Sequence, residues 1–317
     1  MDTLLSVKNL KTYFRVKRGV LRAVDNVSFD IKRGEVFCLV GESGCGKSIT
    51  ALSIMRLIPY PGEIVGGEIL FDGVDLLKLP EEEMEKIRGK RIGMIFQDPH
   101  TSLDPSYTVG WQVEEAILLH KMIKEVSKLA VNLLKKVGIP AAEKRYREYP
   151  HQLSGGLKQR AMIGIAISNS PELLIADEPT TALDVTIQAQ IVDLMLKLRE
   201  ENGISILLIT HDMGLVAEAC DRLAVMYAGK IVEKGSVEEI FSEPLHPYTK
   251  ALLRCVPRPD KDVEKLVAIP GTVPEFPPAS GCRFADRCPM ARKECFEITP
   301  EEVNMGNGHR VACHLYG

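Results

Sequence analysis

The sequence predicts an α/β fold in which a parallel sheet is covered by helices. Two short runs, "LLIAD" (173–177) and "SILLIT" (205–210), are apolar at nearly every residue, and helical sequence separates them. Such runs are typical of strands that are buried on both faces. A third apolar run, "VFCLV" (36–40), leads into a glycine-rich loop and then into a helical stretch. The three runs together indicate buried strands that alternate with helices.

The part of the chain before this loop reads as strands. "LLSVKNL" (4–10) and "LRAVDNVSFDI" (21–31) alternate between apolar and polar residues and are rich in Val, Ile and Phe. This pattern predicts a β-rich edge that precedes the buried strand at 36–40.

The middle of the chain has a helical pattern, and its end is rich in proline. "VSKLAVNLLKKVG" (126–138) has helical spacing and is stopped by Gly138 and Pro140. After about residue 240 the composition shifts to segments such as "IPGTVPEFPPAS", which are typical of loops. We therefore expect one large domain over residues 1–243, with a helical subdomain at about 98–165, and a C-terminal extension over 244–317.

Composition excludes some classes of protein. The 317 residues are 45% hydrophobic and 26% charged, which is typical of one large globular domain with a smaller one. The net charge of −3 provides no basic balance for nucleic acid. The N-terminus lacks a basic start before an apolar core, and no apolar run approaches the roughly 18 residues that span a bilayer. We expect a soluble intracellular chain that can still bind a membrane protein.

The segment "GESGCGKS", from Gly41 to Ser48, fits the pattern G-x-x-x-x-G-K-[ST] between a strand and a helix. Its backbone N–H groups can form an anion nest at a helix N-terminus. Lys47 can reach the β- and γ-phosphates of a nucleotide, and the Ser48 hydroxyl can bind Mg²⁺. An ordinary glycine-rich turn is the alternative. The predicted nucleotide contacts are Gly41, Ser43, Gly44, Cys45, Gly46, Lys47, Ser48 and Ile49.

Polar side chains follow three other predicted strands. Asp177 ends "LLIAD" and can hold Mg²⁺, while the adjacent Glu178 can take a proton from an attacking water. His211 follows "SILLIT" and can hydrogen-bond the γ-phosphate, and Gln97 ends the strand in "IGMIFQDP", where its amide can reach both metal and water. The alternatives are solvated carboxylates at a strand end and a histidine of the surface or core.

A turn of small residues, Ser154, Gly155 and Gly156, begins the apolar helical stretch "LKQRAMIGIAI". Glycines cost backbone entropy and pack nothing, so another group must come close to them. We interpret the turn as a second anion site at a helix N-terminus. A helix cap with close helix packing is the alternative.

These motifs together resemble the ATP-binding subunit of ABC transporters, in that family's order and over roughly residues 1–240. The matching segments are "GESGCGKS", Gln97 in "FQDP", "LSGG" at 153–156, "LLIADE" at 173–178, "ALD" at 182–184, and His211. The resemblance implies a P-loop NTPase fold: a RecA-like core with an antiparallel β subdomain and an inserted α-helical subdomain.

The resemblance also implies a head-to-tail pair of ATPase subunits. ATP would lie between the phosphate loop of one subunit and the "LSGG" of the other, where Ser154 adds a hydroxyl donor. Asp184 would touch the partner, and Lys158 and Arg160 would support the interface or be solvated. An aromatic residue near the N-terminus would stack on adenine; we favour Phe14, with Tyr13 as the alternative.

Three further segments resemble the importers of dipeptides, oligopeptides and nickel: "FQDPHTSLDP", "PLHPYTKALL" (244–253), and the cysteine-bearing tail. The resemblance implies two membrane permease subunits, a homologous ATPase partner, an extracytoplasmic solute-binding protein, and a place at the cytoplasmic face of the membrane. Residues 98–150 would receive a short helix from the permease. Peptide is favoured over nickel because peptide systems are more numerous, while "HPYT" could simply begin a helix.

Two other classes fit less well. A soluble ABC-type ATPase acting on DNA or ribosomes generally has paired cassettes, long heptads or basic patches, none of which this sequence has. A P-loop kinase with a zinc module would leave "LSGG" and "ALD" without a role.

Four cysteines crowd the end of the chain with the spacing C-x₅-C-x₆-C-x₁₇-C: Cys282, Cys288, Cys295 and Cys313. Disulfides are disfavoured in a reducing cytosol, and structural zinc usually uses tighter C-x₂₋₄-C pairs. Four spread thiolates can hold the corners of a [4Fe–4S] cluster, which the family resemblance also supports. We favour the cluster, with Zn²⁺ as the alternative. We expect it to have a structural role, because the C-terminal extension has too few apolar residues to build a large core.

The other histidines near the C-terminus and the scattered cysteines are not expected to bind a ligand. His309 and His314 are expected to be neighbours of the cysteine site or surface residues. The scattered cysteines are expected to be small buried hydrophobes: Cys38, Cys45, Cys220 and Cys255.

Overall fold

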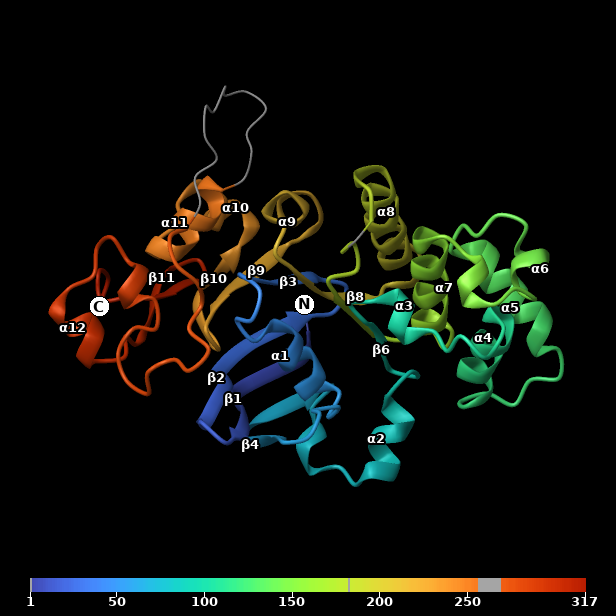
Figure 1. Cartoon of the computed structure of the whole chain (residues 1–317), viewed down its shortest axis with the longest axis horizontal. Coiled ribbons are helices and arrows are strands. Elements are labelled where there is room, and N and C mark those ends of the chain that lie inside the picture. The colour runs from blue at the N-terminus through green and yellow to red at the C-terminus, as the bar shows by residue number, and fades with distance from the viewer. Residues whose placement is uncertain (1, 182, 256–268) are drawn as a thin grey trace. The chain divides into compact units, whose positions relative to one another are not determined.

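The computed structural model describes residues 2–181, 183–255 and 269–317, which form two compact units. The first unit is Lys78–Leu208, and the second contains Asp2–Leu77 and Ile209–Gly317. Each unit combines strands with helices (Figure 1). Ala182 of the predicted "ALD" segment lies outside the described residues.

The strands of the first unit are buried along their whole length. β6 (Ile92–Ile95) and β7 (Leu173–Asp177) are parallel, and β8 (Ser205–Thr210) neighbours β7 and carries the chain toward the second unit. Burial on both faces explains why these runs lack alternation. The strand predicted to reach Gln97 ends earlier, at Ile95.

Helices make up much of the rest of the first unit. They are α2 (Glu81–Ile87), α3 (Pro99–Ser102), α4 (Val109–Leu118), α5 (Val126–Lys136), α6 (Ala142–Arg145), η2 (Pro150–Gln152), α7 (Gly155–Ile167) and α8 (Val185–Asn202). α5 ends just before Gly138, whose φ of 77° is left-handed. α4, α5 and α7 gather together, which explains why α7 is apolar on most of its sides (Figure 1).

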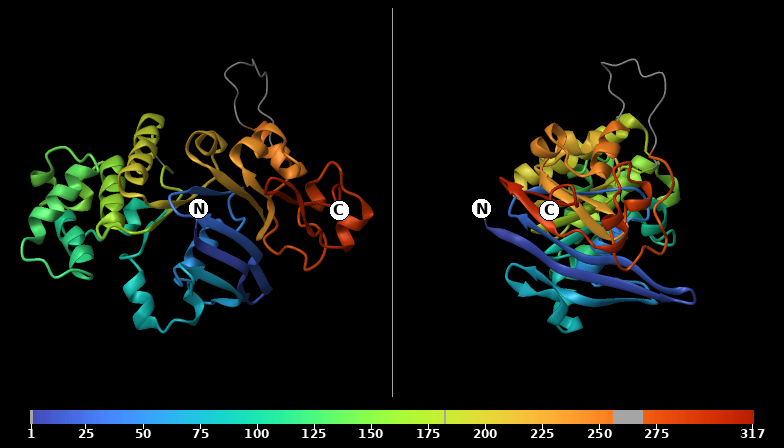
Figure 2. Two further views of the ribbon diagram at one scale, coloured as in Figure 1. Left: turned by 180° about the vertical axis from the view of Figure 1, so that it is seen from behind. Right: turned by 90° about the vertical axis from the view of Figure 1, so that its left-hand side faces the viewer.

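An antiparallel sheet forms the N-terminal part of the second unit. Its strand order is β2-β1-β4-β5. The strands are β1 (Thr3–Val16), β2 (Gly19–Lys32), β4 (Gly62–Phe71) and β5 (Val74–Asp75). The long β1–β2 hairpin is visible as the blue ribbon in Figure 2. The predicted β-rich edge is thus present.

A second group of strands in this unit has the order β11-β12-β10-β9-β3. β3 pairs in parallel with β9, whereas the other pairs are antiparallel. The strands are β3 (Val36–Val40), β9 (Arg222–Tyr227), β10 (Lys230–Ser236), β11 (Glu302–Gly306) and β12 (His309–Ala312). The C-terminal extension, expected to be mostly loop, therefore adds two strands to β10.

Short helices complete the second unit. They are α1 (Lys47–Ile54), α9 (Met213–Ala219), α10 (Val237–Ser242), α11 (Pro247–Arg254), η3 (Ala285–Arg287) and α12 (Lys293–Glu297), and η1 (Leu76–Lys78) lies where the units divide. α10 begins with a capping box in which Ser236 and Glu239 satisfy each other's backbone N–H groups. Across the described residues, no helix has the length and apolarity needed to cross a bilayer.

Candidate functional site

The phosphate loop lies between β3 and α1 in the second unit. At two of its glycines, the neighbouring backbone leaves no room for a side chain. A Cβ at Gly41 would lie 2.2 Å from the carbonyl oxygen of Met226, and one at Gly46 would lie 2.2 Å from that of Ala23. Both glycines also have left-handed φ, 154° and 107°. The loop can therefore reach this shape only with glycine at these positions.

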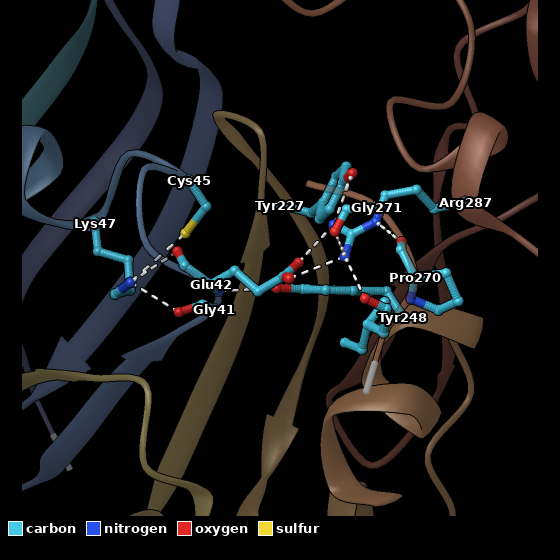
Figure 3. Close-up of polar contacts among 10 residues, drawn as sticks. Gly41, Glu42, Cys45, Lys47, Tyr227, Tyr248, Pro270, Gly271 and Arg287 are labelled. Atoms are coloured by element: carbon cyan, nitrogen blue, oxygen red, sulfur yellow. Dashed lines mark hydrogen bonds and ion pairs between the residues drawn. The ribbon is translucent and has the colours of Figure 1, made fainter. Parts of the chain in front are cut away.

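The Lys47 ammonium is buried and is held by the loop itself. Nζ donates to the carbonyl oxygens of Gly41 at 2.8 Å and Glu42 at 3.1 Å (Figure 3). These bonds satisfy a buried charge, and a phosphate oxygen is a stronger acceptor for the same ammonium. The Lys47 ammonium is therefore a suitable donor for the phosphates of a nucleoside triphosphate.

The other predicted loop residues differ in exposure. Ser43 and Gly44 are exposed at the tip, whereas Ser48 and Ile49 are partly exposed in the first turn of α1. Cys45 is fully buried, and burial raises the pKa of its thiol. The hydroxyl of Ser48 is a hard oxygen donor of the kind that Mg²⁺ prefers.

Two of the predicted catalytic residues meet in the first unit. The Gln97 amide donates to the Glu178 carboxylate at 3.0 Å, and the Thr181 hydroxyl donates to the same oxygen at 3.0 Å. Asp177 is buried at the end of β7, directly before Glu178. Thr181 was not predicted, because nothing in "PTT" marks one threonine over the other.

Glu178 has an unusual backbone. Its φ of 45° is left-handed, a conformation that costs about 1–3 kcal/mol for a residue with a side chain and is concentrated at functional sites. The side chain is nevertheless fixed by Gln97 and Thr181. The structure therefore holds one carboxylate in a strained but defined position.

Ser154 is the N-cap residue of α7, yet its side chain makes no capping hydrogen bond. It is exposed, and Leu153 before it is buried. A serine at this position usually accepts from the N2 or N3 backbone N–H. Its hydroxyl is therefore not used to cap the helix that it begins.

The two glycines of this turn differ in whether packing within the chain requires glycine. A Cβ at Gly156 would lie 3.0 Å from Cγ2 of Ile187 on α8, which is tight packing within this chain. A Cβ at Gly155 would meet only Leu183, at an ordinary 3.7 Å. Close helix packing thus accounts for Gly156, whereas nothing among the described residues requires glycine at 155.

Three residues near this turn are used inside the chain. Asp184 is the N-cap of α8 and accepts from the Ile187 N–H at 3.0 Å. Lys158 is buried and bonds to Nδ1 of His100 at 2.9 Å, while Arg160 donates to the Val137 carbonyl at 2.7 Å. Both side chains are therefore bonded within the chain, Lys158 is not solvated, and the expectation that the two residues support an interface stays a prediction.

The remaining nucleotide candidates lie in the second unit. His211 is exposed, one residue after β8. The Tyr13 hydroxyl donates to Asp25 at 2.8 Å, and the Arg22 guanidinium lies 5.9 Å from the Tyr13 ring centroid. Phe14 is partly exposed, and a Cβ at Gly62 would lie 2.6 Å from its ring.

The four C-terminal cysteines line one small cavity of about 20 Å³. All eight cysteines of the chain are free, and burial raises the pKa of Cys282 to about 11. No set of three or more His, Cys, Asp or Glu side chains in the described part of the chain is arranged to hold a single metal ion.

His246 lines the same cavity and carries a buried polar atom without a partner. Its Nδ1 accepts from the Tyr248 N–H at 3.1 Å, so the proton of the neutral ring is on Nε2. Burial lowers the pKa of His246 to about 3, and Nε2 has no hydrogen-bond partner among the described residues. The donor set at this cavity is therefore soft sulfur plus one unsatisfied N–H, which fits an iron–sulfur centre.

The predictions for the other histidines and cysteines are mixed. His314 lines the cavity, whereas His309 is buried and bonds to Glu233 at 2.8 Å. Cys38 and Cys45 are buried, as predicted. The prediction is wrong for Cys220 and Cys255, which are partly exposed at the ends of α9 and α11.

The sequence did not predict the residues that hold Glu42, the second residue of the phosphate loop. Arg287 binds the Glu42 carboxylate with two hydrogen bonds, and the Tyr248 hydroxyl accepts from the Glu42 backbone N–H (Figure 3). The helix in "LHPYTKALL" does begin as suggested, with His246 as its N-cap. No sequence signal predicted the contact of Tyr248 with the loop.

The helical region of the first unit exposes large apolar side chains on and after α4. Trp111 is 41% exposed and stacks on Tyr107 with centroids 4.0 Å apart. Leu119 and Met122, just after α4, are also exposed. Single exposed apolar residues are common, whereas here several lie along one short segment.

Two family models match the chain. The model described as ABC transporter covers residues 24–181, and the one described as the C-terminal region of oligopeptide/dipeptide transporters covers residues 232–295. The two matches follow one another without overlap.

Relatives match over nearly the full chain. The oligopeptide transport ATP-binding protein AppD of Bacillus subtilis is 52% identical over 100% of this chain and 98% of its own. The dipeptide transport ATP-binding protein DppD of Escherichia coli is 48% identical over 98% of this chain and 96% of its own. Among solved structures, the dimeric ATP-binding cassette MJ0796 bound to ADP and Pi is 30% identical, with a TM-score of 0.66 over 74% of this chain and 98% of that chain.

Proposed function

This chain belongs to the ABC transporter family, among the ATP-binding subunits of oligopeptide and dipeptide transporters, and we propose that it is the ATPase motor of a membrane importer for di- and oligopeptides. Subunits of this kind hydrolyse ATP, pair with a second ATPase subunit and act with membrane permeases. One observation carries the assignment: about half of the residues are identical to peptide-transport ATPases along the whole chain.

The loop and strand-end residues have complementary chemistry for Mg-ATP. The nest of Gly41–Ser48 would hold the phosphates, with Lys47 moving from its carbonyl partners to phosphate oxygens. Ser48, Asp177 and Gln97 supply the oxygen atoms that would hold Mg²⁺, which neutralises charge on the phosphates. Gly44, Cys45 and the other loop residues contribute backbone N–H groups.

Glu178 would take the proton of the attacking water. Its contacts with Gln97 and Thr181 keep the carboxylate in place, and this orientation is what a general base needs. His211 would hydrogen-bond the γ-phosphate. Phe14 would stack on adenine, a choice supported by the Tyr13 hydroxyl already being bonded to Asp25.

Ser154, Gly155 and Gly156 would contact the ATP of a partner ATPase subunit. Two observations support this role: the Ser154 hydroxyl does not cap α7, and Gly155 has no close neighbour that requires glycine. MJ0796, at 30% identity, forms a dimer bound to ADP and Pi. Asp184 would lie at the same interface.

The exposed group on and after α4 would receive the permease at the cytoplasmic face of the membrane. An extracytoplasmic solute-binding protein would deliver the peptide. Trp111 and Tyr107 are the kind of rigid aromatic pair that dominates protein interfaces.

The four C-terminal cysteines would hold a [4Fe–4S] cluster, with Zn²⁺ as the alternative. A tetrahedral zinc ion needs four thiolates around one point, whereas a cluster takes one thiolate at each of four corners. The support for the cluster is that all four thiols line one cavity. The unsatisfied Nε2–H of His246 is a donor for sulfur at this site.

The proposal is tested in cells that lack the gene. Uptake of a labelled tripeptide should be lost, restored by the wild-type chain and not restored by Lys47→Ala. The tagged wild-type chain should also co-purify with polytopic membrane proteins. Loss of nickel uptake with normal peptide uptake would favour the nickel alternative, and recovery with ribosomes or nucleic acid would overturn the transporter assignment.

A further inference from the structure

The C-terminal segment reaches the phosphate loop at one residue, Glu42, the second of the motif. Arg287 donates from Nη1 to Oε2 of Glu42 at 2.7 Å and from Nη2 to Oε1 at 2.9 Å, which is a two-pronged ion pair (Figure 3). The two residues are 245 positions apart in the sequence. The Arg287 side chain is 7% exposed, so solvent screens this pair much less than a surface salt bridge.

The guanidinium has no freedom to turn away from Glu42. Its Nε donates to the Pro270 carbonyl at 2.7 Å and Nη2 to the Gly271 carbonyl at 3.2 Å. Its carbon lies 5.6 Å from the ring centroid of Tyr227, which also accepts from Nη1 at 3.3 Å. The hydrogen bonds to Glu42 raise the pKa of Arg287, so the charge is always present. A planar donor fixed on several sides is built to orient its acceptor.

A second contact fixes the backbone of the same residue. The Tyr248 hydroxyl accepts from the Glu42 N–H at 2.9 Å, and Tyr248 is fully buried. Burial raises the pKa of this phenol, so it stays neutral. Glu42 is thus held by its carboxylate and by its N–H, from two different parts of the C-terminal segment.

The third contact of Glu42 is with Lys47, the predicted phosphate-binding lysine. The Glu42 carbonyl oxygen accepts from the Lys47 ammonium. Rotation of the Glu42 peptide would move this carbonyl and reshape the first turn of the anion nest. A loop held in one shape binds its ligand without the entropic cost of becoming ordered.

We propose that Arg287 and Tyr248 are positioning residues for ATP binding, which act through Glu42 to keep the phosphate loop in its receptive shape. The inference rests on the proposed assignment of Gly41–Ser48 as the phosphate loop. It makes the C-terminal segment a part of the nucleotide site, although neither residue touches the nucleotide.

The test measures the Kd of Mg-ATP for the full-length subunit by fluorescence competition, alongside urea unfolding. Arg287→Met keeps the length and the apolar stem of the side chain but cannot bind Glu42, and it should weaken binding roughly tenfold, the effect of losing one charge-assisted pair. The control is Arg310→Met, an exposed arginine paired with Glu302 on the same segment, which should leave Kd unchanged. A residue that only stabilises the fold would lower the unfolding free energy without changing Kd.

A double mutant separates positioning from simple charge neutralisation. In Glu42→Gln with Arg287→Met no unpaired carboxylate remains to repel the phosphates, yet the loop is still released, so we expect binding to stay several-fold weaker than wild type. Recovery of wild-type affinity in this double mutant would overturn the positioning role.

Two milder variants carry the test if Arg287→Met does not fold. Tyr248→Phe removes one oxygen atom, and Arg287→Lys keeps the charge without the two parallel donors. Each should weaken binding about threefold, and wild-type Kd in both would contradict the inference. If the wild type and Arg310→Met fail to bind Mg-ATP, the phosphate-loop assignment itself is wrong, which is a distinct outcome.

Discussion

Glu178 combines a strained backbone with a carboxylate that two neighbours hold in place. A left-handed glutamate is retained only where the surrounding structure determines it, and here Gln97 and Thr181 both bond to its side chain. Such a residue is suited to a task that needs orientation more than flexibility. Taking a proton from a single attacking water is a task of this kind.

Glu178→Gln should therefore bind ATP but fail to turn it over. The amide has nearly the shape of the carboxylate and can keep both hydrogen bonds, but it cannot take a proton, so kcat should fall at least a hundredfold. Phosphate release reports kcat, and light scattering should find the ATP-bound pair accumulating. The control is Glu200→Gln, an exposed position on α8. Turnover close to wild type in Glu178→Gln would remove Glu178 from the mechanism.

The local part of the site was predictable from the sequence, and the long-range part was not. Gly41–Ser48 is a continuous motif in which strand, turn and helix signals agree, so its backbone shape follows from neighbouring residues. Arg287 meets Glu42 across 245 residues, and no local pattern encodes such a contact. Thr181 was missed for the related reason that its role depends on where Glu178 points.

At the start of α7, one glycine is explained by packing and its neighbour is not. Gly156 lies against Ile187, whereas Gly155 has only an ordinary contact with Leu183. The sequence predicted the turn and the helix, but it could not divide the two glycines between a folding role and a binding role. That division needs the position of α8, which tertiary packing decides.

Leucine at each of the two glycines should give opposite results. Gly156→Leu overpacks the contact with Ile187 and should lower the free energy of unfolding by about 1–3 kcal/mol. Gly155→Leu should change that free energy by less than roughly 0.5 kcal/mol, and it should abolish steady-state ATPase activity while the ATP affinity of the isolated subunit stays intact. Urea unfolding and phosphate release measure the two effects. Full turnover in Gly155→Leu would show that no partner approaches this turn.

Elements were predictable where burial is uniform or periodic. β3, β7 and β8 are buried at every residue and appear in the sequence as unbroken apolar runs. β11, with the sequence "EVNMG", is mostly exposed and has no such signal. It is a strand because it pairs with β12, which in turn pairs with β10. Edge strands of this kind depend on the partner more than on their own residues.

At the scale of the whole molecule, the C-terminal extension has little apolar core of its own. It is attached by buried polar contacts, such as the bonds of Arg283 to Asp25 and to the Ala228 carbonyl. A centre held by four cysteines would join its loops and so contribute to its folding.

If the four cysteines hold the proposed centre, removing it should destabilise the chain. Protein purified without oxygen should be brown and contain iron and acid-labile sulfide, and chelation should lower its melting temperature by several degrees, as expected for a loss of about 1–2 kcal/mol. Cys295→Ser should reduce the iron content, whereas Cys220→Ser, in the other group of cysteines, should not. Colourless protein with one zinc per chain would favour Zn²⁺ over the cluster.

The largest scale is the pair of subunits, because the proposed site is completed by a second chain. In an isolated subunit the phosphate loop can bind ATP, but no Ser154 turn from a partner reaches it, so activity per subunit should fall on dilution while ATP affinity does not. Lys47→Ala and Gly155→Leu should each be inactive alone. Mixed, they should recover about a quarter of wild-type activity, because half of the pairs are mixed and each mixed pair has one intact site of two. If the mixture stays inactive while light scattering detects mixed pairs, or if diluted monomers retain full activity, each subunit must carry a complete site of its own.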